Sequence, residues 1–131
     1  MLHHLSIGAK DIERAARFYD AVMKPLGYVR VWTDLRPGEQ HQALGYGPPG
    51  GDDQLAVKQV SQDIPAIPGF HIAFSAQTRE AVRNFHAAAL AAGGQDNGAP
   101  GLRPDYGDHY FAAFVLDPEG HRIEAVCKVA D

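Results

Sequence analysis

An internal repeat with a fixed shift of 67 residues is the feature of this sequence that most restricts its fold. The shift aligns residues of matched type at five positions, pairing His4 with His71, Asp11 with Thr78, Phe18 with Phe85, Tyr19 with His86 and Gly27 with Gly94. Such a repeat indicates two copies of one structural unit. We therefore predict one unit over residues 1–62 and another over residues 69–131. Each unit of about 60 residues would bury too little surface alone, so the two units should pair.

The first unit is predicted to begin with a strand over residues 4–9, followed by a helix. Asp11 is a suitable N-cap for this helix. Apolar residues then recur at three- and four-residue steps, at Ile12, Ala15, Ala16, Tyr19, Val22, Met23 and Leu26. This stripe would pack on a sheet, and Pro25 and Gly27 would end the helix. Later strands, expected over residues 28–33, 42–46 and 55–60, complete a strand-helix-strand-strand-strand (βαβββ) unit.

The second unit repeats this pattern after a linker over residues 61–69, which carries two prolines. Its helix should begin after Thr78 and stop at Gly94. Its clearest strands are expected over residues 70–75, 113–116 and 121–128. The last two form a hairpin around the turn Asp117-Pro118-Glu119-Gly120, in which each residue type suits its position. The sequence thus predicts an α+β protein.

The last predicted strand holds a carboxylate among apolar neighbours. Alternation places Ile123, Ala125 and Cys127 on one face of the strand, and Glu124 and Val126 on the other. Glu124 either points to solvent on the open face of a sheet, or points into a cavity that gives it a proton, a cation or a metal. Only the second reading makes Glu124 part of a functional site.

The composition of the chain argues against nucleic acid and membranes as binding partners. The chain has 131 residues, a formal net charge of -4 and a pI near 5.9, so it has no basic field that would gather nucleic acid or bind a membrane surface. No apolar run approaches the roughly 20 residues that span a bilayer. The single cysteine, Cys127, cannot form an internal disulfide, and no secretory leader is recognisable. We therefore expect a cytoplasmic protein that does not bind nucleic acid or membranes.

The repeat turns two unremarkable histidines into a pair. If a pseudo-two-fold axis relates the units, His4 and His71 lie equivalently about it, and Glu124 can face the same space. Two histidines and one carboxylate form a ligand set with open coordination positions, suited to Fe, Mn, Ni or Zn. Taken alone, each histidine would be read as an ordinary strand residue. Their equivalence across the repeat places the paired reading on an equal footing with that one.

Three segments of the sequence resemble the vicinal oxygen chelate superfamily, which includes glyoxalase I, extradiol dioxygenases, and the bleomycin and fosfomycin resistance proteins. The segments are HLSIGAKDIERAARFYDAVMKPLGY at residues 4–28, GFHIAF at residues 69–74 and FVLDPEGHRIEAV at residues 114–126. The resemblance covers essentially the whole chain. It implies two βαβββ units forming a cupped, partly closed mixed sheet with the helices packed outside, commonly within a homodimer.

The resemblance also implies a function. Metal-bound members of the family take ligands from the first and last strands of each unit, which here correspond to His4, a residue within 55–60, His71 and Glu124. The expected protein is a metal-dependent lyase or dioxygenase acting on a small oxygenated molecule, with Glu124 as its catalytic carboxylate. The alternative is a metal-free, small-molecule-binding protein of the bleomycin-resistance type.

The first unit departs from glyoxalase I, which has a glutamate at the ligand position of its last strand. Matching the segment LAVK at residues 55–58 to the family places Lys58 there, whereas the shift of 67 residues places Val57 opposite Glu124. This one-residue difference decides which side chain points inward. An inward Lys58 about 4 Å from a divalent metal would cost about 8 kcal/mol at an effective dielectric of about 20, so it would instead pair with Glu124 and replace the metal. An outward Lys58 leaves the two histidines and Glu124 able to bind a metal.

The loop over residues 101–110 gathers cationic, aromatic and hydroxyl side chains just before a central strand. These are Arg103, Tyr106, Asp108, His109 and Tyr110. Such a set suits a small anionic or oxygenated ligand, although a solvated loop whose tyrosines pack on the sheet explains it as well. We take Arg103, Tyr106 and His109, with Lys58, as candidate substrate-binding residues. The equivalent side of the first unit could be lined by Trp32, His41 and Tyr46.

Overall fold

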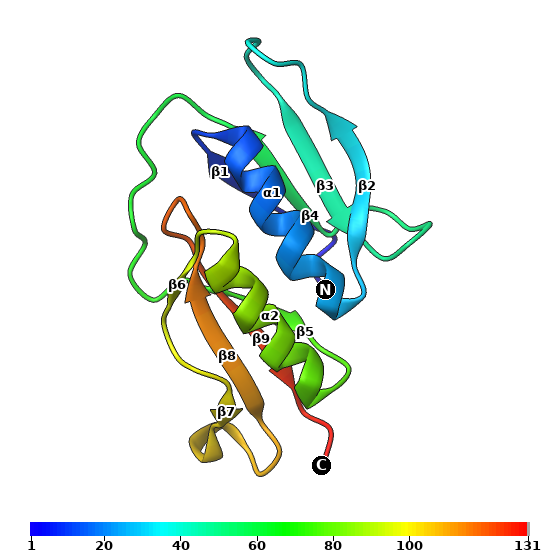
Figure 1. Cartoon of the computed structure of the whole chain (residues 1–131), viewed down its shortest axis with the longest axis vertical. Helices are drawn as coiled ribbons and strands as arrows, with labels where there is room; N and C mark the ends of the chain where they lie inside the picture. Colours follow the sequence, from blue (N-terminus) through cyan, green and yellow to red (C-terminus); the bar gives the residue numbers. More distant parts are fainter. Residues whose placement is uncertain (131) are drawn as a thin grey trace.

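The computed structural model describes residues 1–130 and contains two units, each with one helix lying on one sheet (Figure 1). The first unit consists of β1 (Leu5–Ala9), α1 (Ile12–Met23), the short 3-10 helix η1 (Lys24–Leu26), β2 (Val29–Asp34), β3 (Ala43–Gly47) and β4 (Leu55–Gln59). The second consists of β5 (Ile72–Ser75), α2 (Arg79–Ala91), β6 (Gln95–Asp96), β7 (Gly101–Leu102), the 3-10 helix η2 (Pro104–Tyr106), β8 (Phe111–Leu116) and β9 (Arg122–Cys127). The predicted α+β class is confirmed.

Both sheets order their strands in the same way. The first runs β1-β4-β3-β2 and the second β5-β9-β8-β6, with β7 also paired to β8. In each unit the first strand lies parallel to the last, and the remaining pairs are antiparallel. A first strand parallel to the last requires a crossover between them, and the helix provides it. The sheets are therefore mixed, as the βαβββ pattern predicts.

The two helices begin where the sequence predicts. The Asp11 carboxylate accepts the backbone N–H of Arg14, and the Thr78 hydroxyl accepts that of Ala81, so each N-cap satisfies one of the free N–H groups of its first turn. The apolar stripe of each helix packs on its sheet to form the core. At the end of the first helix, Gly27 adopts a φ of 84°, a left-handed conformation that glycine adopts without strain.

The second unit departs from the first in one strand. The repeat calls for a continuous strand between α2 and β8, and the structure has instead the two-residue strands β6 and β7, which pair with opposite ends of β8. Gly98, between them, has a φ of 145°, and Pro100 has no N–H to give to the ladder. After β7 the chain passes through the 3-10 helix η2 before it enters β8.

The turn between β8 and β9 ties the second unit to the first. Its buried Asp117 accepts a 2.6 Å hydrogen bond from the Tyr19 hydroxyl of α1 and two bonds from backbone N–H groups of the turn. Glu119, in the same turn, accepts the backbone N–H of Asp11 and a 3.1 Å bond from the Arg14 guanidinium. Negative charge at a helix N-terminus is favourable. The turn therefore holds the start of α1 and helps to fix the two units against each other.

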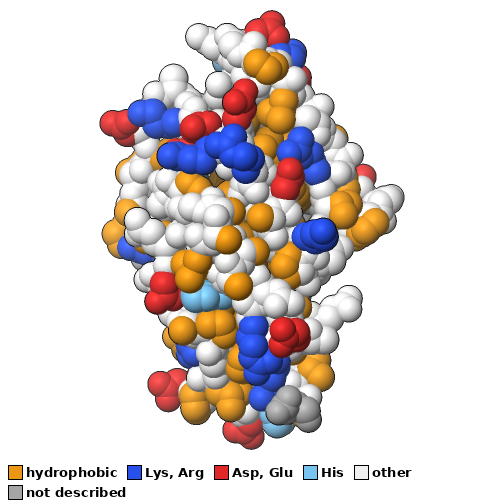
Figure 2. Space-filling view, in the orientation of Figure 1, with side chains coloured by type: hydrophobic (Ala, Val, Ile, Leu, Met, Phe, Trp, Pro, Cys, Tyr) orange, Lys and Arg blue, Asp and Glu red, His pale blue; other side chains and the backbone are white. Residues whose placement is uncertain are grey.

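The helices lie on one side of the molecule and leave one face of each sheet open. Figure 1 is viewed from the helical side, with α1 in front of the first sheet and α2 in front of the second. That side carries acidic and basic side chains close together, as expected of a solvated surface (Figure 2). No helix within residues 1–130 is long and apolar enough to cross a membrane. The faces turned away from the helices carry the candidate site.

Candidate functional site

Glu124 lies on the open face of the second sheet. Its neighbours Ile123 and Ala125 pack in the core beneath α2, so strand alternation turns Glu124 to the opposite side. It pairs with Ala73 of β5 and Phe114 of β8. The residue is nevertheless only 1% exposed, so the reading in which it points to solvent is wrong.

Two side chains cover the Glu124 carboxyl and bond both of its oxygens. His71 Nε2 lies 2.9 Å from Oε1, and the Tyr110 hydroxyl donates a 2.5 Å hydrogen bond to Oε2. A buried carboxyl is costly unless its oxygens are hydrogen bonded, and these two bonds provide that compensation. The His71 side chain is half exposed, so the cluster reaches the surface on the His71 side. The structure thus brings His71 and Glu124 together, and their role as metal ligands stays a prediction.

Tyr110 is the contact that the sequence analysis did not select. It immediately precedes the core-facing Phe111, so alternation puts its side chain on the open face beside Glu124. Burial, followed by the hydrogen bond to Glu124, raises the pKa of Tyr110 to about 12, so the phenol keeps its proton at neutral pH and acts as the donor. The alternation of the strand it precedes is the signal that could have singled it out from its loop.

The remaining candidate residues of this loop make no hydrogen bond to Glu124 that the structure records. Arg103 stacks over the Phe114 ring, 5.4 Å from its centroid, and donates a 2.8 Å bond to the Ala99 carbonyl, which fixes a positive charge next to the cluster. The Tyr106 ring meets the Tyr110 ring edge-on at 5.2 Å and is largely exposed. His109 is exposed.

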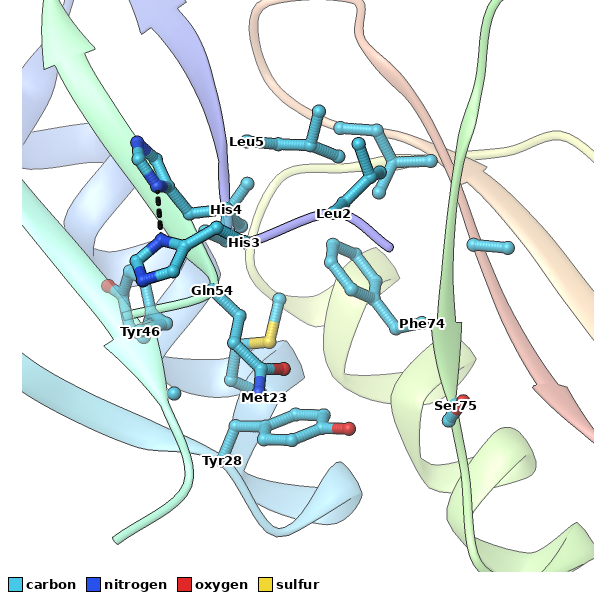
Figure 3. Close-up of a pocket in the computed structure, with 14 residues that line it drawn as sticks. Leu2, His3, His4, Leu5, Met23, Tyr28, Tyr46, Gln54, Phe74 and Ser75 are labelled. Atoms are coloured by element: carbon cyan, nitrogen blue, oxygen red, sulfur yellow. Dashed lines mark hydrogen bonds between the residues drawn. The ribbon is translucent and has the colours of Figure 1, made fainter. Parts of the chain in front are cut away.

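His4 lies apart from this cluster. It immediately precedes β1, its Nδ1 lies 2.8 Å from that of His3, and both histidines line a recess of about 270 Å³ between the units. Figure 3 shows Tyr28 on one side of this recess and Phe74 of β5 on the other. Within residues 1–130, no three His, Cys, Asp or Glu side chains are grouped so that they could hold a metal ion. One chain therefore brings together two of the three predicted ligands.

The strand register settles where Lys58 points. Leu5 pairs with Leu55 in the first unit, and Ile72 pairs with Ile123 in the second. The first strands of the two units are therefore related by a shift of 67 residues, whereas the last strands are related by a shift of 68. Ala56, not Val57 or Lys58, therefore occupies the place of Glu124. This is a correction to both alignments of the sequence: Val57 is buried in the core, and Lys58 is exposed on the open face two residues beyond Ala56.

Two aromatic candidates of the first unit, Trp32 and Tyr46, lie on opposite faces of the first sheet. Trp32 pairs with Gly45, which pairs with Ala56, so its indole lies on the open face of the first sheet. A Cβ on Gly45 would lie 2.3 Å from the indole nitrogen, so only glycine leaves room for the ring. Tyr46 instead faces α1, where its buried hydroxyl donates a 2.8 Å bond to Asp20, and it does not line the open face.

Comparison with known proteins gives one family. The model of the Glyoxalase/Bleomycin resistance protein/Dioxygenase superfamily matches residues 1–125. The structure is similar to a glyoxalase/bleomycin resistance protein from Albidiferax ferrireducens T118, with a TM-score of 0.77 and 29% identity over 98% of this chain and 99% of that one. A comparison with curated proteins gives no match.

Two more distant structures share the fold. The fosfomycin resistance protein FosX from Listeria monocytogenes is similar with a TM-score of 0.69 and 15% identity, over 98% of this chain and 93% of that one. A glyoxalase I mutant from Zea mays is similar with a TM-score of 0.69 and 18% identity, over 95% of this chain and 46% of that one. At these identities the similarity shows the fold alone.

Proposed function

The chain belongs to the Glyoxalase/Bleomycin resistance protein/Dioxygenase superfamily, and from this premise we propose that it is a metal-dependent enzyme acting on a small oxygenated molecule. His71 and Glu124 of one copy and His4 of a second copy would hold a divalent metal, Fe, Mn, Ni or Zn. One observation carries the proposal: a carboxyl only 1% exposed lies on an otherwise open sheet face with an imidazole nitrogen 2.9 Å from one of its oxygens.

The donor set fits a metal of this kind. Imidazole nitrogen and carboxylate oxygen are ligands that Fe, Mn, Ni and Zn accept, and two such atoms 2.9 Å apart can belong to one coordination shell. Ala56, at the place equivalent to Glu124 in the first unit, has no side-chain atom that could coordinate a metal. Two histidines and one carboxylate would therefore be the whole protein ligand set, which leaves coordination positions for a substrate.

A second copy is proposed because one chain separates the ligands. Each sheet has one uncovered face, and His4 belongs to the first unit while His71 and Glu124 belong to the second. In a two-fold homodimer, the first unit of each copy can face the second unit of the other, and the symmetry then produces two identical sites. Each site would combine His4 from one chain with the His71 and Glu124 pair from the other.

The side chains around this site suit an oxygenated, negatively charged substrate. A metal supplies Lewis acidity, which stabilises negative charge on substrate oxygens. Arg103 is held beside Glu124, and exposed Lys58 lies on the open face that would oppose it, so both would attract anionic groups. Tyr106 and His109 would line the rim. Glu124 is the proposed catalytic carboxylate because it is the buried carboxylate of the open face.

Metal stoichiometry tests the proposal directly. Purified protein would be dialysed to equilibrium against Fe(II), Mn(II), Ni(II) and Zn(II) in turn and analysed for metal content, with Glu124→Ala treated alongside. We expect about one metal per chain in the wild-type protein. The variant should lose this metal, because it lacks the Glu124 carboxylate of the proposed ligand set. Such binding would direct substrate tests to 2-oxoaldehyde thiohemiacetals and catechols. Metal content no higher than that of Glu124→Ala would contradict the enzyme proposal.

The alternative is a metal-free binding protein. It is favoured by the fact that His71 and Tyr110 satisfy both oxygens of Glu124 with hydrogen bonds. In this case Lys58 of a second copy would neutralise Glu124, and the space between the open faces would bind a small molecule. Failure of the wild-type protein to bind metal would support this reading. For either function we propose a homodimer whose open faces meet, and a cytoplasmic location, where a free thiol such as the buried Cys127 stays reduced.

A further inference from the structure

We propose that Tyr110 is a positioning residue that holds Glu124 as a ligand through one oxygen only. The inference rests on the proposed metal site and assigns a role that none of the predicted ligands has. Oε2 is taken by the Tyr110 hydroxyl at 2.5 Å, while Oε1 lies 2.9 Å from His71 Nε2. The oxygen beside His71 is therefore the one placed to share a metal with it.

The two partners hold the carboxyl from different elements. His71 immediately precedes β5 and Tyr110 immediately precedes β8, and these strands flank Glu124 through Ala73 on one side and Phe114 on the other. A carboxyl bonded from both sides is restrained from rotating about its terminal bond. Hydrogen bonds of this kind to the second oxygen of a ligand orient the ligand and raise its affinity for the metal.

Tyr110 is itself held by its loop. Its carbonyl oxygen accepts a 2.8 Å bond from the backbone N–H of Arg103, and its own N–H donates to the Gly107 carbonyl. Its ring packs edge-on against Tyr106. Because the backbone and the ring are both held, the hydroxyl is presented to Glu124 in one place. The loop that carries this phenol follows β7, the second piece of the interrupted strand.

The hydrogen bond from Tyr110 limits how many coordination positions Glu124 can fill. A carboxylate with both oxygens free can bind a metal through two atoms and fill two coordination positions. With Oε2 bonded to Tyr110, Glu124 would fill one position only. Since the Ala56 side chain supplies no ligand from the first unit, a six-coordinate metal would keep three positions for water or substrate oxygens, one more than if Glu124 bound through both oxygens. Tyr110 would therefore determine how many substrate atoms can reach the metal.

The test uses Co(II), whose visible spectrum reports the number and arrangement of its ligands. Affinity would be measured by competition with a chelator, and the spectrum recorded, for wild-type protein and for Tyr110→Phe, which keeps the ring against Tyr106. We expect affinity to fall about 10- to 100-fold and the absorption bands to change in position and intensity. Affinity and spectrum equal to those of wild type would overturn the assignment.

Tyr19→Phe is the matched control. It also removes a phenol-to-carboxyl hydrogen bond, of 2.6 Å to Asp117, but at the junction of the units. This control should lower stability and leave the Co(II) affinity and spectrum unchanged; a change as large as that of Tyr110→Phe would show a merely structural effect and overturn the role of Tyr110. Wild-type protein that does not bind Co(II) would instead contradict the proposed function itself, so the two failures are distinguishable.

Discussion

A one-to-one mixture of His4→Ala and Glu124→Ala chains, dissociated and allowed to reassociate, will bind metal although neither variant binds it alone. The expectation follows from a site that takes His4 from one chain and the His71 and Glu124 pair from another. In a hybrid dimer, the Glu124→Ala chain still supplies His4, and the His4→Ala chain still supplies the pair. One of the two sites is then complete, and the other lacks both residues.

The amount of metal that the mixture binds depends on how the two kinds of chain pair into dimers. Random reassociation of a two-fold dimer gives hybrids in about half of the dimers, each with one intact site, so the mixture should bind about one quarter of the wild-type amount of metal. Elemental analysis after dialysis measures it. A mixture of His71→Ala with Glu124→Ala is the control, because both lesions fall in the same half-site and no pairing restores it. Absence of recovery in the first mixture, or equal recovery in both, would show that the ligands are not shared between chains.

Asp117→Ala will lower the free energy of unfolding by about 3–4 kcal/mol, because it leaves several hydrogen-bond donors without an acceptor. The side chain is 4% exposed and accepts from Tyr19 and from the backbone N–H groups of Glu119 and His121. Alanine leaves the buried Tyr19 hydroxyl unpaired and loosens the turn whose Glu119 binds the start of α1. Urea denaturation followed by circular dichroism measures the change.

A double-mutant cycle separates the parts of this effect. Tyr19→Phe removes one hydrogen bond and should cost about 1–2 kcal/mol, less than Asp117→Ala, which loses two further bonds in the turn. In the double variant, the phenol is no longer left unpaired, so its loss of stability should be smaller than the sum of the two single losses. Strict additivity would mean that the 2.6 Å bond between these side chains contributes nothing to the junction.

Local rules predict much of this fold from sequence. The caps at Asp11 and Thr78 require only a side-chain oxygen three residues before the N–H that it accepts, and such spacing is visible in the chain. Alternation likewise predicts the face on which Glu124 lies. Its burial could not be predicted, because it depends on His71 and Tyr110, which are 53 and 14 residues away in sequence.

The register of the first unit could not be predicted for a related reason. A constant shift assumes that both units have loops of equal length, and the pairs of Leu5 with Leu55 and Ile72 with Ile123 show one residue of difference. Because strand side chains alternate, this single residue exchanges the faces of Val57 and its neighbours. A repeat alone does not locate the added residue, whereas the pairing of the parallel strands does.

Trp32 gives the molecule a built-in optical reporter. It is the only tryptophan in the chain, it lies on the open face of the first sheet, and it is 38% exposed. Indole emission shifts to shorter wavelength when water around the ring is replaced by protein or ligand. Dilution, subunit exchange or ligand addition can therefore be followed by fluorescence without a label, since anything that covers or uncovers this face changes the surroundings of a single emitter.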